Sequence, residues 1–301
     1  MKRTYITILL LAVTLSAFSQ RNMIIFKHGG TQQYIALSSI DSLTFRDTTM
    51  IAVIGGTFTA GSTLTTISSF NIDKYEVTYD KWTTVATWGA THGYTDLYAG
   101  TNGYSPVGAN NPVTTVSWYD VVKWCNARSE RDGLTPVYCT DNTLATVYRT
   151  GTLDILPDCV KWTANGYRLP TEAEWEFAAK GGTLAQSTPY TYSGSNAIDG
   201  VAWYYDNSSS ETHTVGAKTP NELGIYDMTG NAWELCWDWY DTAYPSGGAT
   251  DPKGPTTSQT YRLIRGGSYY DYAEPNCRVV TRGTYDPSAR GSTVGFRCVQ
   301  D

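Results

Sequence analysis

Helix-forming patterns occur only before Gly181 in this 301-residue chain, and this limits the folds that it can adopt. Residues 78–88 and 117–128 each begin at a capping residue, and Thr171 with Glu174 forms a capping box that predicts a third helix. After Gly181 we find only short strand-like runs between Gly, Ser and Asn turns. Helices followed by short strands predict an α+β fold.

The composition indicates how such a chain fills its interior and which partners it excludes. Tyr (23) and Trp (10) are abundant while charged residues make up 17%, which favours an irregular domain packed with aromatic side chains. The net charge is −6 and no basic cluster occurs, so we expect no nucleic-acid partner, because phosphate binding needs concentrated Lys and Arg.

The first residues have the pattern of a signal peptide. Lys2 and Arg3 precede an apolar run at residues 5–15, and small residues follow up to Ser19. The run is too short to span a bilayer, so we do not expect a membrane-spanning protein. We predict a signal peptide over residues 1–19 and an exported protein, whether secreted, periplasmic or on the cell surface.

The remaining chain divides into two parts. Residues 23–27 and 33–37 are strand-like runs around a Gly-Gly turn signal, which predicts a small β-hairpin unit over residues 20–49. The main domain is predicted over residues 50–301.

Within the main domain, residues 51–58 and 70–77 are expected to form strands. Residues 130–166 form a long insertion with Cys139 and Cys159 near its ends. A bridge between these two cysteines would close its base; otherwise a connection of this length should be mobile.

Residues 221–234 concentrate oxygen ligands around one turn. We expect a short strand, a turn at Gly230 and then a run that alternates apolar and oxygen-bearing residues. If the loop bends back at Gly230, the carboxylates of Asp227 and Glu234 and the carbonyls of Gly230 and Ala232 can surround one point. Calcium prefers such hard oxygen ligands. The alternative is a surface turn with its acids in water.

Six cysteines follow the predicted signal peptide, and an even number in an exported protein favours disulfides. Their spacing does not choose among the possible pairings. The three histidines are widely scattered, so a His-based iron, zinc or copper centre is not expected.

Four ordered blocks give the chain a specific resemblance. They are residues 55–58 (GGTF) with 75–78 (YEVT), 166–176 (GYRLPTEAEWE), 224–234 (GIYDMTGNAWE), and 265–268 (RGGS) with 295–297 (GFR). With these blocks the chain resembles the sulfatase-modifying factors, the formylglycine-generating-enzyme family. The resemblance implies one compact domain with an elaborated C-type-lectin-like fold and little regular secondary structure.

The resemblance also implies ligands for a structural calcium ion. The family holds calcium with a side chain at the position of Asp227, carbonyls at those of Gly230 and Ala232, and a carboxylate at that of Glu234. It further implies a disulfide, present in some members, between Cys125 and Cys298. For the other cysteines we guess the pairs Cys139–Cys159 and Cys236–Cys277.

The active centre of the family is not matched. Family oxidases bind copper through two cysteines placed just after the RGGS block, whereas Asp271 stands at the first of these positions and Cys277 at or next to the second. A carboxylate is a hard ligand and does not replace a thiolate on Cu(I), so copper is not expected. Cys277 is the only catalytic candidate, as a nucleophile without an evident base or as half of a structural bridge. The enzymatic alternative is a formylglycine-generating oxidase with a variant site, acting on a cysteine of a sulfatase or related protein.

Residues 269–293 suggest a binding surface instead. They are rich in Tyr, Ser, Gly, Asp and Arg, the composition of a paratope, and they resemble the variable face of C-type-lectin-like proteins diversified by retroelements. An unrecognised enzyme and a scaffold without a ligand remain alternatives, and the ligand could be a protein or a glycan. The predicted contact residues are Tyr269, Tyr270, Asp271, Tyr272, Tyr285 and Arg290.

Overall fold

The computed structural model describes residues 22–26, 32–36, 50–61, 63–102, 108–184, 190–242 and 249–301. The chain forms two compact units, Met1–Asp47 and Thr48–Asp301, and each is considered by itself. In the first unit β1 (Asn22–Phe26) pairs antiparallel with β2 (Gln32–Ala36), as the hairpin pattern predicts. The predicted signal peptide lies outside the described residues.

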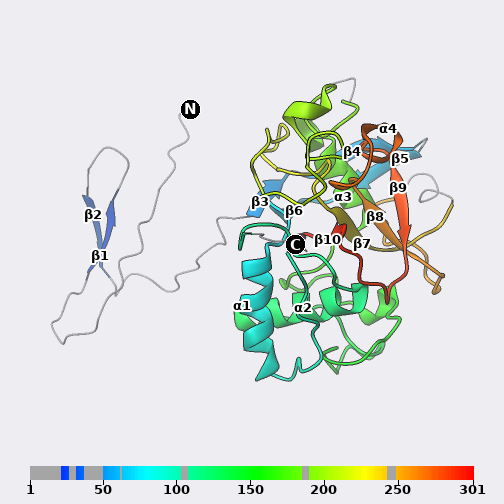
Figure 1. The fold of residues 1–301 in the computed structure, drawn as a ribbon. Helices are drawn as coiled ribbons and strands as arrows, with labels where there is room; N and C mark the ends of the chain where they lie inside the picture. Colours follow the sequence, from blue (N-terminus) through cyan, green and yellow to red (C-terminus); the bar gives the residue numbers. More distant parts are fainter. Residues whose placement is uncertain are drawn as a thin grey trace. The chain divides into compact units, whose positions relative to one another are not determined.

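The second unit combines helices with short strands in three separate sheets (Figure 1). A four-stranded sheet has the order β10-β7-β8-β9, a three-stranded sheet the order β11-β6-β3, and β4 pairs with β5. Its helices are α1 (Tyr79–Ala90), α2 (Trp118–Arg131), α3 (Glu172–Ala179) and α4 (Ala273–Asn276), with short 3-10 turns η2 (Pro157–Cys159), η3 (Gly182–Leu184) and η4 (Ile198–Gly200). Its strands are β3 (Met50–Val53), β4 (Gly56–Ala60), β5 (Thr63–Ile67), β6 (Phe70–Asp73), β7 (Trp233–Trp239), β8 (Arg262–Arg265), β9 (Arg282–Tyr285), β10 (Val294–Gly295) and β11 (Val299–Gln300). This is the α+β class that the sequence predicts.

The three predicted helices begin where their capping residues place them. The Thr78 side chain accepts a hydrogen bond from the Lys81 N–H at the start of α1. Ser117 and Thr171 form reciprocal capping boxes with the acids three residues later, at the starts of α2 and α3. These side chains satisfy N–H groups that the first helical turn leaves without backbone partners.

The strand predictions were less accurate. The predicted strand 51–58 is two strands, since β3 pairs with β6 while β4 pairs with β5. The break falls at Gly55, where a Cβ atom would lie 2.5 Å from a backbone oxygen of β5. The predicted strand 70–77 ends at Asp73, and the strand expected before Gly230 is absent because β7 begins only at Trp233.

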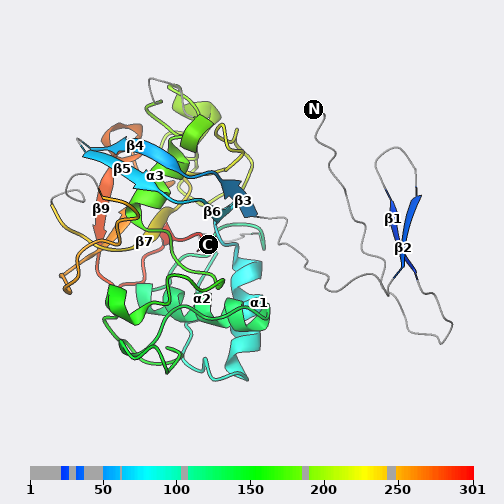
Figure 2. The ribbon, with the colours of Figure 1, turned by 180° about the vertical axis from the view of Figure 1, so that it is seen from behind.

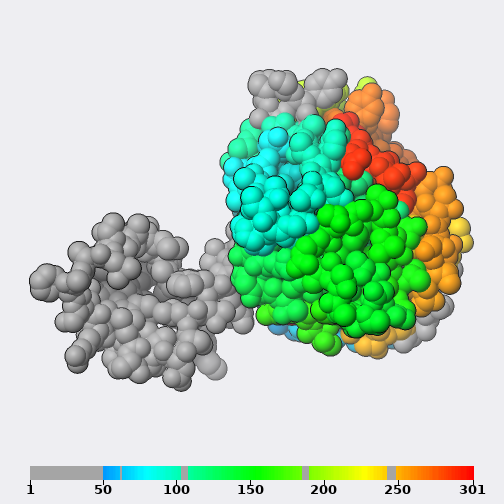
Figure 3. Space-filling model, turned by 90° about the horizontal axis from the view of Figure 1, so that it is seen from below, coloured from blue at the N-terminus to red at the C-terminus, as the bar shows by residue number. Residues whose placement is uncertain are grey.

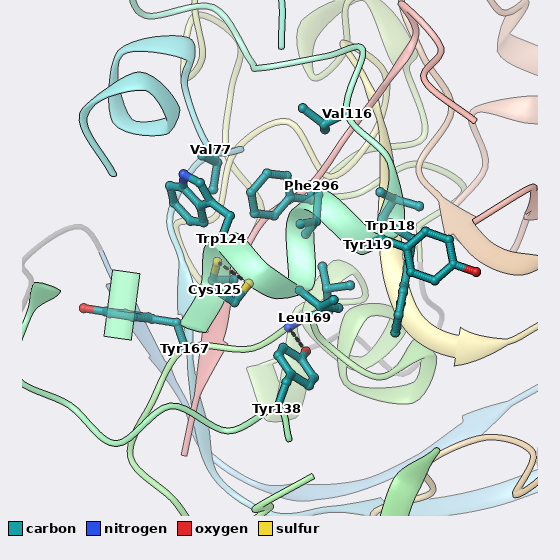
Figure 4. Packing of buried hydrophobic residues seen from close by; sticks show 14 of the residues in the cluster. Val77, Val116, Trp118, Tyr119, Trp124, Cys125, Tyr138, Tyr167, Leu169 and Phe296 are labelled. Atoms are coloured by element: carbon teal, nitrogen blue, oxygen red, sulfur yellow. Dashed lines mark hydrogen bonds between the residues drawn. The ribbon is translucent and has the colours of Figure 1, made fainter. Parts of the chain in front are cut away.

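The main hydrophobic core joins the two long helices to the C-terminal segment (Figure 4). Trp82 of α1 stacks on Trp124 of α2 with ring centroids 5.5 Å apart, and Phe296 meets both rings edge-on. All three side chains are buried. Aromatic rings of this size account for a large share of a core's buried area, so this cluster fixes α1 against α2.

Helix α3 packs against two different β structures (Figures 1 and 2). It contacts the hairpin β4–β5 on one side and strands β7 and β8 on the other. Its Trp175, Phe177 and Ala178 are buried in a second core cluster with Leu263 of β8. Residues that precede or follow β7 and β8 are therefore held on a rigid support.

The 130–166 insertion is packed rather than loose. The Cys139 N–H donates to the Cys159 carbonyl at 2.9 Å, so backbone pairing closes its base. Tyr138 is fully buried in the main core, and its hydroxyl accepts a hydrogen bond from the Leu169 N–H at 2.8 Å. In Figure 3 this green segment covers a broad area beside the cyan α1 segment. Within the part of the chain that is described, no helix combines the length and apolar character needed to cross a bilayer.

Candidate functional site

A buried group of carboxylates surrounds the turn that precedes β7. Glu234, the second residue of that strand, accepts from the Arg297 guanidinium through both oxygens at 2.7 and 2.6 Å. The Trp175 indole N–H donates to the same carboxylate at 2.7 Å. Glu234 is thus a predicted metal ligand that already has three strong donors, and it joins β7 to α3 and to the C-terminal segment.

Glu76 also belongs to this group, although we did not select it as a site residue from the sequence. Its two oxygens accept from the Ala232 N–H at 2.9 Å and the Asn231 amide at 2.6 Å. Burial, with the nearby charges of Asp227 and Glu234, raises the pKa of the Glu76 carboxyl well above its usual range. Its only signal in the sequence was membership in the 75–78 block.

Asp227 has a spare oxygen. Its Oδ2 atom accepts from the Gly216 N–H at 2.7 Å, while its buried Oδ1 atom has no hydrogen-bond partner. Burial raises the pKa of this carboxyl to about 6. An unpartnered buried carboxylate oxygen is costly, so this atom fits a cation that neutralises it.

The donor set around this turn fits calcium. Gly230 has a φ of +76°, and a Cβ there would lie 2.2 Å from the Trp203 carbonyl oxygen, so only glycine allows the predicted bend. Outside the strand ladders, no hydrogen bond among the described residues ends on the Gly230 or Ala232 carbonyl. No three His, Cys, Asp or Glu side chains of the described residues converge as a metal site, and the predicted set contains only two acids with two carbonyls. Asp227 and the Gly230 and Ala232 carbonyls have free oxygens that would hold the ion, whereas Glu234, the fourth predicted ligand, already accepts from Arg297 and Trp175.

The loop that follows the RGGS block is organised by Asp271. The Asp271 Oδ2 atom accepts from the Ser268 N–H at 3.0 Å, the Ser268 hydroxyl at 2.5 Å and the Trp233 indole N–H at 2.8 Å. Its Oδ1 atom accepts from the Asn276 amide at 2.9 Å. The residue at the missing cysteine position is therefore a hydrogen-bond acceptor that holds residues 268–276 against β7.

Cys277 is a buried thiol behind the same loop. A Cβ on Gly267 would lie 2.7 Å from the Cys277 sulfur, so the RGGS backbone packs directly on this side chain. Burial, with the Asp271 carboxylate second, raises the pKa of the Cys277 thiol to about 12. The reactive form of a cysteine is the thiolate, which this environment disfavours. Neither His92 nor His213 hydrogen-bonds to it: their ring nitrogens pair with backbone carbonyls.

The predicted disulfides are not present in this structure, where all six cysteines are free thiols. The sulfurs of Cys125 and Cys298 are 3.7 Å apart in the core (Figure 4), longer than the roughly 2.05 Å of a disulfide. These two thiols are adjacent, so the bond between them stays a prediction.

The guessed pair Cys236–Cys277 is not supported. Cys236 packs among the side chains around Trp175, whereas Cys277 packs with Tyr192 and Tyr204 in a separate cluster. The two sulfurs therefore belong to different parts of the interior. Cys139 and Cys159 lie on paired backbone segments, as a bridge would require, but both are thiols here.

The predicted contact surface contains one group of exposed aromatic rings. Tyr270 and Tyr272 are 59% and 57% exposed, and Tyr205, which was not predicted, is 40% exposed. The Tyr205 ring lies 4.5 Å from that of Tyr272 and 5.9 Å from that of Tyr270. We call Tyr205, Tyr270 and Tyr272 the tyrosine cluster. The Tyr205 N–H donates to the Asp271 carbonyl, which joins the two segments.

The other predicted contact residues are less available. Tyr269 is buried, so it offers far less contact area than Tyr270, although it lines the hollow described below. Asp271 is engaged internally, and the Tyr285 hydroxyl accepts from the Gly291 N–H. Arg290 forms an ion pair with Asp120 of α2 at 2.9 Å. Residues 269–271 form a turn rather than a strand, in which Tyr269 is buried and Tyr270 is exposed, and the composition alone did not reveal this.

A hollow of about 520 Å³ lies next to the tyrosine cluster. Three segments that are distant in the sequence form it, and Tyr270 is shared between the hollow and the cluster. We call it the serine hollow, and its lining residues are Ser209, Ser210, Glu211, Tyr269, Tyr270, Ser292 and Thr293.

Comparison with known proteins identifies the family. Residues 39–301 match the Sulfatase-modifying factor enzyme 1-like domain, the FGE-sulfatase family. The chain belongs to this family. Its α+β architecture with little regular structure is the fold of the family, as the resemblance implied.

Relatives within the family have different names. The chain is 35% identical over 279 residues to the chaperone protein LppX of Paenibacillus barcinonensis, covering 83% of this chain and 89% of LppX. It is 35% identical over 152 residues to the formylglycine-generating enzyme of Streptomyces coelicolor, covering 45% of this chain and 47% of that enzyme. The match thus spans about half the length of the Streptomyces enzyme.

Solved structures show the same fold. The crystal structure of CarF superposes with a TM-score of 0.69 at 29% identity, covering 83% of this chain and 97% of CarF. Treponema denticola variable protein 1 superposes with a TM-score of 0.66 at 28% identity, covering 94% of this chain and 99% of that protein.

Proposed function

We propose that this chain is an exported, calcium-stabilised member of the sulfatase-modifying-factor family that binds an external ligand and has no copper oxidase activity. The observation that carries the proposal is the arrangement of one loop, in which Tyr270 and Tyr272 are exposed while Asp271 between them is fully hydrogen-bonded. The two exposed rings are therefore carried by a backbone segment that the hydrogen bonds of Asp271 hold in place. A rigid, amphipathic contact surface binds at a low entropy cost.

The same loop argues against the oxidase alternative. A Cu(I) centre of the family type needs two thiolates, and position 271 offers a hard carboxylate whose oxygens already accept four donors. Cys277 supplies a single thiol, and its burial favours the protonated form. A formylglycine-generating oxidase with a variant site would need a second soft ligand, which this loop does not offer.

Calcium and export complete the proposal. The unpartnered Oδ1 atom of Asp227 and the excess of carboxylates over the single Arg297 guanidinium support a bound cation, whose role would be to stabilise the turn before β7. The basic start and apolar run of residues 1–19 support export. Extracellular calcium concentrations suit a structural site of modest affinity.

The names of two relatives are consistent with a binding role. One is called a chaperone and another a variable protein, and neither name describes a reaction. For this chain we therefore place the function at the tyrosine cluster rather than at Cys277.

The binding proposal is tested with two matched variants of the full chain. Wild type, a triple variant (Tyr205→Ser, Tyr270→Ser and Tyr272→Ser) and the control Tyr261→Ser are immobilised and exposed to an aqueous envelope extract of the cells that express the protein. Tyr261 is 45% exposed and is the residue directly before β8, so it does not belong to the tyrosine cluster. We expect wild type and control to retain material that the triple variant loses. Equal retention by all three would overturn the proposal.

The oxidase alternative is tested by peptide mass. The purified protein is incubated with copper, dioxygen, a thiol reductant and a Cys-x-Pro-x-Arg peptide. We expect the peptide thiol to remain. Conversion of that cysteine to an aldehyde would overturn the non-catalytic part of the proposal.

A further inference from the structure

The serine hollow has walls that are fixed before any ligand arrives. The Ser208 hydroxyl donates to the Tyr269 carbonyl at 2.7 Å, and the Trp233 N–H donates to the Thr293 carbonyl at 2.9 Å. The His213 ring nitrogen hydrogen-bonds the Ser208 carbonyl at 2.8 Å. A pre-organised site loses little conformational entropy on binding.

Backbone strain is concentrated in one wall. Ser209 and Ser210 are consecutive non-glycine residues with φ values of +58° and +61°. Such conformations are sparsely populated and persist where surrounding contacts impose them, often at ligand sites. Here the Ser210 N–H donates to the Ser208 hydroxyl at 3.1 Å, which helps to impose this turn.

The polar groups of the hollow are not used by the protein. Among the described residues, no side-chain hydrogen bond or ion pair engages the side chains of Ser209, Ser210, Glu211, Ser292 or Thr293. Each hydroxyl can both donate and accept, and the carboxylate can accept at two oxygens. By contrast, the carboxylate of Asp271 nearby is fully engaged. The hollow therefore offers a ligand both hydrogen-bond donors and hydrogen-bond acceptors.

The lining excludes several ligand classes. Among the described residues, no Lys or Arg lines the hollow, so an anion would meet only the like charge of Glu211 there. The lining alternates small hydroxyl side chains with the rings of Tyr269 and Tyr270, so it suits a ligand that carries both polar and apolar groups better than a purely aliphatic one. A cation would gain from one partly exposed carboxylate, a weak interaction, and would leave the hydroxyl donors unpaired.

We propose that the serine hollow binds a neutral saccharide, an inference that rests on the proposed binding function and specifies its ligand class. The sugar hydroxyls exchange hydrogen bonds with Ser209, Ser210, Ser292 and Thr293, and two adjacent hydroxyls donate to the two oxygens of Glu211. The Tyr270 ring packs on the apolar C–H groups of the sugar. A volume of about 520 Å³ is within the range of small-molecule sites and accommodates a short oligosaccharide.

The test uses the neutral polysaccharide fraction of the same envelope extract, taken after anion exchange and protease treatment, with an oligo-arginine peptide as the contrasting probe. We expect wild type and Tyr261→Ala to bind the neutral fraction. Glu211→Gln should weaken binding about tenfold, since a hydrogen bond to a charged group is lost. Tyr270→Ala should weaken it by about tenfold or more. Both altered residues lie at the surface, so thermal unfolding of the variants should match wild type.

Three results would overturn the saccharide inference: no retention of the neutral fraction, retention of oligo-arginine alone, or equal binding by wild type, Glu211→Gln and Tyr270→Ala. The untreated extract separates this failure from failure of the proposed function. If retention depends on the tyrosine cluster but disappears after protease treatment, the ligand is a protein, and the binding function stands without the saccharide. If retention never depends on the cluster, both proposals fail.

Discussion

Two aspartates on neighbouring loops have opposite hydrogen-bond balances. Asp271 accepts from Ser268, Trp233 and Asn276, and its oxygens are fully engaged. Asp227 accepts from the Gly216 N–H alone and keeps a buried oxygen without a partner. The first carboxylate fixes the shape of its loop without help, whereas the second leaves a buried charge that the proposed calcium ion would balance.

The comparison separates two uses of a carboxylate within one fold. Where N–H and O–H donors surround the group, it acts as a structural connector. Where carboxylates outnumber the cations beside them, the site is incomplete without a ligand. The following experiments test this distinction, beginning with the largest expected effect.

Arg297→Met should have the largest effect on stability. The substitution leaves the buried Glu234 carboxylate without its guanidinium partner. The negative charge of Glu234 is then uncompensated beside Glu76 and Asp227. Breaking a buried ion pair costs about 3–5 kcal/mol, measurable by urea denaturation. The control is Arg131→Met, whose ion pair with Asp132 is partly exposed and should contribute at most about 1 kcal/mol. Equal losses in both variants would contradict the buried-cluster interpretation.

Calcium should raise the melting temperature of wild type, and a chelator should remove the gain. At about 100 times its dissociation constant, a ligand that binds only the folded state stabilises by about 2.7 kcal/mol. Asp227→Asn should reduce this gain because the amide supplies one oxygen where two existed. Glu234→Ala is a poorer probe, since it also removes the partner of Arg297. A wild-type melting curve that is indifferent to calcium and chelator would exclude the ion.

Asp271→Ala should cost about 1–3 kcal/mol, because it leaves the Trp233 and Asn276 donors without an acceptor. Calcium should not change this loss. Asp286→Ala is the matched control, since Asp286 accepts only from its local turn at Ser288 and is exposed. Denaturant midpoints measured with and without calcium give the comparison. A loss at position 271 no larger than at position 286 would show that Asp271 does not hold the loop.

A third buried acid predicts a pH dependence. Burial, and then the charge of Glu172, raise the pKa of Asp238 to about 8, against about 3.9 in the unfolded chain. Folding therefore takes up a proton between these values, so the contribution of Asp238 is fully present below about pH 4 and is lost as the pH rises towards 8. Relative to wild type, Asp238→Asn should gain up to roughly 1.4 kcal/mol per pH unit in this window. A difference in unfolding free energy that stays constant from pH 5 to 8, within about 0.5 kcal/mol, would contradict the raised pKa.

Three of the four helices described could be predicted from local chemistry, and the strands only in part. Helix α4, which lies after Gly181 where we expected only strands and turns, was missed because it spans four residues and has no capping side chain. Thr78, Ser117 and Thr171 cap their helices through side-chain contacts three residues away, which a sequence records directly. The split at Gly55 depends on which partner each half meets, β6 for β3 and β5 for β4, and the run of residues 51–58 does not contain this information.

The candidate site divides in the same way. Asp227 and Glu234 could be selected because they belong to one short block with Gly230. Glu76 and Tyr205 could not, because each joins its group across a long separation in the chain, through Ala232 and through Asp271 respectively. At Tyr269 the composition indicated contact, but the turn at residues 269–270 buries most of the ring, which composition does not reveal.

Asp271 has a consequence for how this protein can change over generations. Because it carries the contacts that shape its loop, the residues on either side contribute contact area without contributing to folding. Substitutions at positions 270 and 272 are therefore expected to be tolerated. Under the proposed binding function, recognition can therefore diversify at these two positions at little cost in stability.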